Sequence, residues 1–93
     1  MQIAEIKERA ASVLSRHDVA EAYLFGSTVR HEAQADSDVD ILVRFRHLGG
    51  LFDYMKVKFE LEDALARRVD LVQMEALRPE FRASVEKERV QIV

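Results

Sequence analysis

The sequence is poor in several residue types, and each shortage excludes a kind of protein. Its 93 residues include no cysteine, no tryptophan, one proline and three glycines. Without cysteine, the chain has neither disulfides nor thiolate metal sites, which suits a reducing compartment. The scarcity of proline and glycine argues against linkers and low-complexity segments.

Long hydrophobic runs and an excess of basic charge are also missing. No apolar stretch approaches the ~20 residues that a membrane-spanning helix requires. The first residues, Met1 to Glu5, have neither the basic nor the apolar region of a signal peptide. The net charge of -3 at pH 7 gives no positive field that would hold a polyanion. We therefore expect a cytoplasmic protein that binds neither a membrane nor nucleic acid directly.

The composition that remains is that of an ordinary globular protein, with 48% hydrophobic and 33% charged residues. A chain of this length predicts a single domain over residues 1–93 with one modest core. It leaves little room for a lid or a second lobe.

Hydrophobic periodicity predicts an α/β domain. Helices are expected at 2–16, 51–67 and 79–88, strands at 19–25, 38–45 and 68–73, and an edge strand or extended tail at 91–93. Pro79 fits the first turn of the last helix, where its missing N–H has no partner to lose. In the helix at 51–67, the apolar side expected to face the core consists of Leu51, Phe52, Met55, Phe59, Leu61 and Leu65.

Two of the predicted strands carry aspartates among hydrophobic residues. Asp38 and Asp40 lie two positions apart, so they point to the same face of their strand. If the strand at 68–73 pairs with this strand, Asp70 joins the same face. Neighbouring carboxylates repel one another unless a cation lies between them, and hard oxygen ligands favour magnesium. Three aspartates can hold the two magnesium ions of an in-line displacement.

Gly26 and Ser27 stand where the first strand ends, ten residues (28–37) before Asp38. A glycine lets the backbone turn sharply and approach a ligand closely. A serine at the start of a helical turn offers a hydroxyl and an N–H to a phosphate. The spacer allows a short helix and a return loop, which would bring this phosphate site beside the aspartates.

These residues carry a family resemblance. The segment from Gly26 to Val43 resembles the active-site signature of the DNA polymerase β-like nucleotidyltransferase superfamily. Nearly the whole chain resembles the minimal nucleotidyltransferases (MNT) of that superfamily, including the stretches 60–62 and 68–72. MNT proteins are paired with HEPN-domain proteins, and many are the antitoxins of HEPN/MNT toxin–antitoxin modules.

The resemblance implies a fold, a site and a reaction. The fold would be a small mixed β-sheet flanked by helices. Asp38 and Asp40 would bind two Mg²⁺ ions, Asp70 would bind the catalytic one and help deprotonate the acceptor, and Gly26, Ser27 and Arg30 would contact the nucleotide. The reaction would transfer AMP from ATP to a hydroxyl, in the antitoxin branch a tyrosine of the HEPN toxin, with release of pyrophosphate.

Other interpretations of the same residues stay open at this point. The aspartates could form a solvent-facing strand edge that resists aggregation, Ser27 could be a helix cap, and Arg30 could form a surface salt bridge. The protein could neutralise a HEPN partner by binding alone, or transfer a nucleotide to a small molecule. The base preference, the number of nucleotides added and the homo- or hetero-oligomeric state are not fixed by the sequence.

Overall fold

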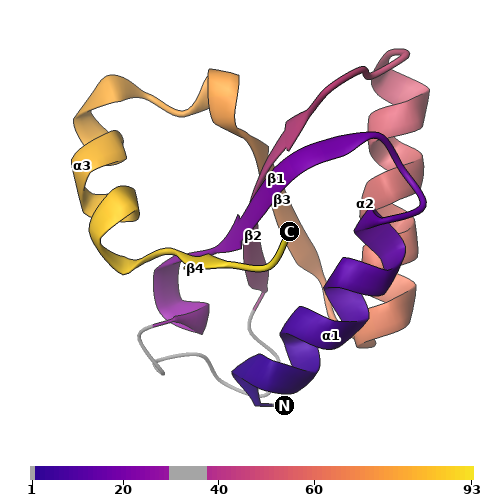
Figure 1. The fold of residues 1–93 in the computed structure, drawn as a ribbon, viewed down its shortest axis with the longest axis horizontal. Helices are drawn as coiled ribbons and strands as arrows, with labels where there is room; N and C mark the ends of the chain where they lie inside the picture. Colours follow the sequence, from indigo (N-terminus) through magenta and orange to yellow (C-terminus); the bar gives the residue numbers. More distant parts are fainter. Residues whose placement is uncertain (1, 30–37) are drawn as a thin grey trace.

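A four-stranded sheet forms the centre of the molecule in the computed structural model, which describes residues 2–29 and 38–93 (Figure 1). The helices are α1 (Ile3–Leu14), α2 (Leu51–Leu65) and α3 (Pro79–Glu88), and the 3₁₀ turns are η1 (Gly26–Thr28) and η2 (Met74–Ala76). The strands are β1 (Val19–Leu24), β2 (Val39–Phe45), β3 (Val69–Gln73) and β4 (Val90–Gln91). The predicted elements are therefore confirmed, with their ends shifted by one or two residues.

The sheet is mixed, as the sequence predicts, with strand order β3-β2-β1-β4. Strand β1 runs antiparallel to both β2 and β4, whereas β2 and β3 are parallel. Parallel neighbours need a long crossover connection, and here helix α2 provides it. The expectation that residues 68–73 pair with residues 38–45 is confirmed.

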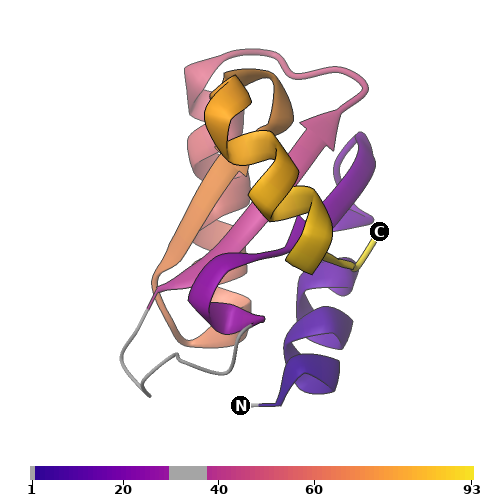
Figure 2. The ribbon, with the colours of Figure 1, turned by 90° about the vertical axis from the view of Figure 1, so that its left-hand side faces the viewer.

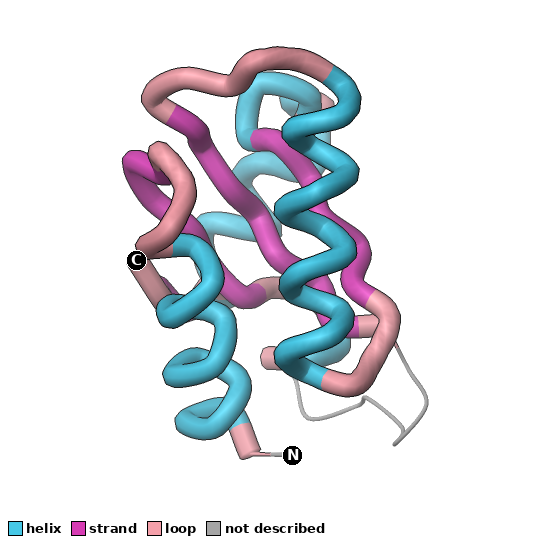
Figure 3. Tube along the Cα trace, turned by 90° about the vertical axis from the view of Figure 1, so that its right-hand side faces the viewer, coloured by secondary structure: helices cyan, strands magenta, loops and turns pink. Residues whose placement is uncertain are grey.

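The two faces of the sheet are covered unequally. Helices α1 and α2 lie together on one face (Figure 3), whereas α3 crosses the other (Figure 2). Most of the core lies on the α1/α2 side, where the fully buried large side chains include Ile6, Leu14, Ile41 and Leu61. On the α3 side a smaller cluster consists of Tyr23, Leu42 and Val85. One face of the sheet is therefore buried under the larger core, and the other is only thinly covered.

Only part of the apolar side expected for helix α2 faces the sheet. Its buried residues are Val57, Leu61 and Leu65, whereas Phe52 is 90% exposed and Phe59 is 55% exposed. The prediction that the phenylalanines belong to the core is wrong. Both sides of this helix carry apolar residues at helical spacing, so periodicity alone does not select one. Packing selects the side with the branched Val57 and Leu61, four residues apart.

Within the described residues, no helix is long and apolar enough to cross a membrane.

The turn from α2 into β3 fixes how β3 lies against β2. The Glu62 carboxylate accepts a hydrogen bond from the Val69 N–H at 2.9 Å, and the Arg68 carbonyl accepts one from the Val39 N–H at 2.9 Å. Ala66 takes the left-handed conformation (φ 54°) that ends the helix. These bonds set the register in which β3 pairs with β2.

We expect Glu62→Ala to lower the free energy of unfolding by about 1–2 kcal/mol, because the N–H of the buried Val69 loses a charged acceptor. Urea denaturation at constant m-value measures this loss. Glu62→Gln keeps an acceptor oxygen at the same position and is the control, with a smaller loss. If both variants unfold at the wild-type midpoint, Glu62 does not hold the start of β3.

Candidate active site

Asp40 and Asp70 are brought together by the parallel pairing of β2 and β3. They are direct partners in the register, between the pairs Val39–Val69 and Ile41–Leu71. Ile41 and Leu71 are buried toward α1 and α2, so the aspartates point to the opposite, thinly covered face. Asp40 is half-buried and Asp70 is exposed. Two carboxylates therefore stand side by side on a face that solvent reaches.

Asp38 precedes β2 and does not join this pair. Its carboxylate forms an ion pair with Arg68, with 3.2 Å between Asp38 Oδ1 and Arg68 Nε, and its side chain is 49% exposed. Across the parts of the chain that the structure describes, no three acidic or histidine side chains gather closely enough to hold a metal ion. The structure thus unites two of the three predicted ligands and places the third on an arginine.

The donor set nevertheless fits a magnesium ion. Asp40 and Asp70 offer carboxylate oxygens, the ligands that Mg²⁺ prefers, from adjacent positions on one face. The Asp38–Arg68 pair is well exposed, and such surface pairs contribute at most ~1 kcal/mol. To join the other two aspartates at a metal ion, Asp38 would have to give up its contact with Arg68. The loss of that contact would cost little stability.

Gly26 lies directly against Asp40. It has a positive φ of 66°, and a Cβ at this position would lie 2.5 Å from the Asp40 Oδ2. A side chain here would be strained and would also collide with the carboxylate. The absence of a side chain at Gly26 therefore allows the end of β1 to approach the Asp40 carboxylate.

Thr28 ties the turn η1 to the strand that carries Asp40. Its hydroxyl oxygen accepts a hydrogen bond from the Asp40 N–H at 3.2 Å, and the side chain is 6% exposed. The Phe25 N–H donates to the Asp40 carbonyl at 3.2 Å. Sequence reasoning missed Thr28, for which the signal was a small hydroxyl residue directly after the Gly-Ser pair.

The remaining predicted nucleotide contacts are only partly described. Ser27 lies within η1, between Gly26 and Thr28, and so belongs to the turn beside Asp40. Arg30, predicted to contact the nucleotide, lies outside the described residues.

Tyr54 supports β3 from the α2 side. Its hydroxyl donates a hydrogen bond to the carbonyl of Leu71, the residue after Asp70. Burial, and in second place the negative charge of Asp70, raise the pKa of the Tyr54 hydroxyl above its usual value. The hydroxyl therefore stays protonated at neutral pH and keeps its bond to the strand.

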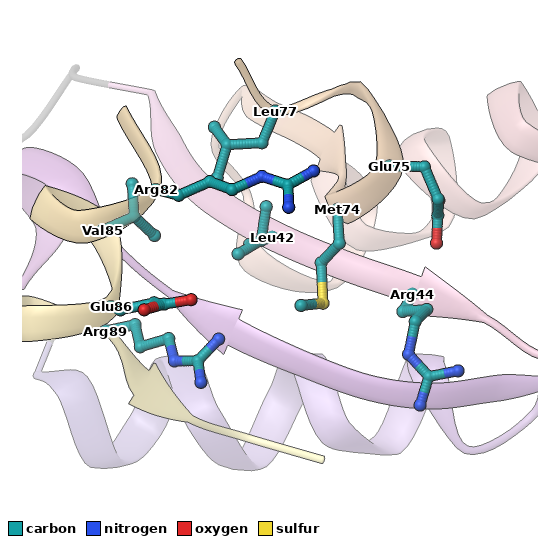
Figure 4. A pocket seen from close by; sticks show the side chains of 9 residues that line it. All are labelled: Leu42, Arg44, Met74, Glu75, Leu77, Arg82, Val85, Glu86 and Arg89. Carbon is teal, nitrogen blue, oxygen red and sulfur yellow. The ribbon is translucent and has the colours of Figure 1, made fainter. Parts of the chain in front are cut away.

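A pocket of about 220 Å³ opens on the same face of the sheet as Asp40, between β2, η2 and α3 (Figure 4). It is lined by Leu42, Arg44, Met74, Glu75, Leu77, Arg82, Val85, Glu86 and Arg89. Arg44 is not available inside it, because its guanidinium donates to the Glu21 carboxylate at 2.9 Å. That hydrogen bond lowers the pKa of the Glu21 carboxyl below its usual value.

Comparison with known proteins assigns this arrangement to one family. The sequence profile described as polymerase beta, nucleotidyltransferase, matches residues 8–93. A protein of Thermococcus cleftensis named protein adenylyltransferase MntA is 42% identical over 77 residues, which cover 83% of this chain and 78% of that protein.

Two solved structures share the fold. One, described as a candidate minimal nucleotidyltransferase, superposes with a TM-score of 0.81 at 38% identity, covering 97% of this chain and 95% of that one. The other contains a tri-AMPylated Shewanella oneidensis HEPN toxin in complex with an MNT antitoxin. It matches with a TM-score of 0.73 at 22% identity, covering 100% of this chain and 72% of that one.

We expect Gly26→Ala to destabilise the protein by about 1–2 kcal/mol from backbone strain alone, with a further loss from the collision with Asp40. A double-mutant cycle with Asp40→Ala isolates the second contribution, because removing the carboxylate removes the collision. Gly50→Ala is the matched control. Gly50 also has a positive φ, of 143°, but nothing lies within 4 Å of its Cβ position. The interaction free energy between Asp40→Ala and Gly26→Ala should exceed that between Asp40→Ala and Gly50→Ala. If it does not, Gly26 and Asp40 are not in contact.

We expect Asp70→Asn to raise the melting temperature in the presence of EDTA. Like charges directly opposite one another in a sheet destabilise it by about 0.2–1 kcal/mol, and the substitution removes one of them. The gain should shrink at high salt, which screens the exposed charge. Asp63→Asn, on the exposed side of α2, changes the net charge equally and should have no such effect. A lower melting temperature for Asp70→Asn would mean that the carboxylate is structural.

Proposed function

Because the chain belongs to the polymerase beta nucleotidyltransferase family, we propose that it is a magnesium-dependent protein adenylyltransferase. It transfers AMP from ATP to a hydroxyl group of a HEPN-domain partner, most simply a tyrosine, and acts as the antitoxin of that partner. The observation that carries this proposal is the pairing of Asp40 with Asp70 beside the side-chain-free Gly26.

The named relatives supply the substrate class and the partner. The Thermococcus relative is named a protein adenylyltransferase, and the Shewanella structure holds an AMPylated HEPN toxin bound to its MNT antitoxin. The first relative shares 42% of the aligned residues with this chain, which is enough to expect the same chemistry. The HEPN partner is extended to this chain as part of the proposal.

The chemistry is a single displacement at the α-phosphorus of ATP. The hydroxyl oxygen of the acceptor forms the new bond to phosphorus, the bond to the bridging oxygen breaks, and pyrophosphate leaves with that electron pair. Magnesium, when bound, would supply positive charge to the phosphate oxygens. Asp40 and Asp70 would hold the ion, with Asp38 joining them in place of its contact with Arg68.

Each remaining residue of the site has a task in this displacement. A tyrosine hydroxyl has a pKa of about 10, so it must lose its proton as the new bond forms. Asp70 is the exposed carboxylate of the pair and would accept that proton. Gly26 leaves space for the phosphates beside Asp40, and the Thr28 hydroxyl keeps η1 attached to β2 while they bind.

The test is intact-mass spectrometry of the cognate HEPN protein after incubation with this protein, ATP and magnesium. Wild type should make the partner heavier by one or more AMP units and release pyrophosphate. Asp40→Asn should leave the mass unchanged, because it removes a charged oxygen from the site. Asp63→Asn, at an exposed position of α2 on the other side of the sheet, should behave as wild type.

Equal partner masses after incubation with wild type and with Asp40→Asn would contradict adenylyl transfer. If both proteins still neutralised the toxin, binding alone would be the mechanism.

A further inference from the structure

The pocket between β2, η2 and α3 has no part in the displacement described above, although it opens beside the aspartates. Its floor is Leu42, which follows Asp40 by two residues and therefore shares its face of β2. Two residues of a strand span about 7 Å. A group attached to a phosphate at Asp40 is therefore within reach of the pocket.

The sheet order fixes the direction in which such a group points. Gly26 follows β1 and Asp70 lies in β3, so they flank Asp40 of the middle strand on opposite sides. In-line displacement needs the leaving pyrophosphate and the attacking hydroxyl on opposite sides of the phosphorus. If the phosphates extend toward Gly26 and the acceptor approaches from Asp70, both directions along the reaction line are occupied. The nucleoside must therefore extend from the α-phosphate in another direction. The direction along β2 from Asp40 to Leu42 leads it under α3.

The pocket is too small for a whole nucleoside triphosphate. Its volume of about 220 Å³ lies below the ~300 Å³ at which pockets for complete small ligands begin. Most of its lining surface is apolar, and the apolar residues among its lining are Leu42, Met74, Leu77 and Val85. This size and lining suit a flat ring system rather than a chain of phosphates.

In the part of the chain that the structure describes, Arg82 is the one of the three pocket arginines that is free to meet a ligand. Arg44 is held by Glu21, and the Arg89 guanidinium lies 4.1 Å from the centre of the Tyr23 ring. Within residues 2–29 and 38–93, Arg82 has no ion-pair partner, and Figure 4 shows it reaching from α3 toward the middle of the pocket. A guanidinium stacks well on a planar aromatic ring.

We propose that this pocket binds the nucleoside of the nucleoside triphosphate, with the base between Leu42 and the Arg82 guanidinium. Glu75 and Glu86 also line the pocket, and their carboxylates can accept hydrogen bonds from amino and imino N–H groups of a purine. This assignment rests on the proposed function, because it takes the phosphates to lie at Asp40. It makes Arg82 a specificity-determining residue.

The experiment compares two probes, Mg²⁺–ATP and Mg²⁺–tripolyphosphate, by isothermal titration calorimetry. The second probe has the phosphates without the nucleoside. Arg82→Ala removes the stacking group, and Leu77→Trp fills the pocket. Arg78→Ala removes the same charge just before α3 from a residue that does not line the pocket, so it controls for long-range electrostatics.

We expect Arg82→Ala and Leu77→Trp to weaken ATP binding about 10-fold relative to Arg78→Ala, as the loss of one stacked base does. Tripolyphosphate binding should be the same in Arg82→Ala and Arg78→Ala. Circular dichroism checks that Leu77→Trp is folded, and Arg82→Ala, at an exposed position, tests the proposal independently.

Unchanged ATP binding in Arg82→Ala would overturn the assignment and leave the proposed function intact. Equal weakening of both probes would also overturn it, because Arg82 would then be a phosphate ligand. If ATP binding persisted while modification of the partner was lost, the pocket would hold the acceptor side chain instead. Wild-type protein that bound neither probe would refute the proposed function, and the nucleoside assignment with it.

Discussion

The parallel pairing of β2 with β3 is the constraint on which the rest of the site depends. Only this register puts Asp40 and Asp70 opposite each other, with Ile41 and Leu71 buried behind them. A slip of β3 by one residue would turn the Asp70 carboxylate toward the core and leave Asp40 without its partner. Helix α2 makes the crossover, and the Glu62 carboxylate and the Arg68 carbonyl fix where β3 begins. The position of the Asp70 carboxylate is thus decided by hydrogen bonds at the C-terminal end of a helix.

The turn η1 is fastened to the same strand by a separate set of contacts. The Asp40 N–H is bonded to Thr28, the Asp40 carbonyl to the Phe25 N–H, and the Asp40 carboxylate lies against Gly26. Three different parts of one residue therefore contact the segment that would meet the phosphates. The distance between Asp40 and the turn η1 is consequently set by short local contacts, and it does not require a lid or a second lobe.

The sequence predicts the fold and the aspartate pair because both follow from residue patterns within one or two secondary-structure elements. Alternation places Asp40 on one face, the run Val69–Val72 identifies the partner strand, and Pro79 marks the start of α3. The contact of Asp38 with Arg68 and the role of Glu62 depend on where two segments meet after folding. The exposed Phe52 shows the same limit, because both sides of α2 carry apolar residues and only the packed sheet selects between them.

Strand β4 is the last strand to be synthesised, and it covers the outer edge of β1. It pairs Gln91 with Tyr23 of β1, and Ile92 is buried in the main core. Gly26, Asp40 and Asp70 all leave the ribosome before these residues do, so the site residues are present while the outer edge of β1 is still open. An unpaired strand edge is a template for pairing with other chains. The nascent protein is therefore exposed to wrong strand pairing until residues 90–92 emerge and occupy that edge.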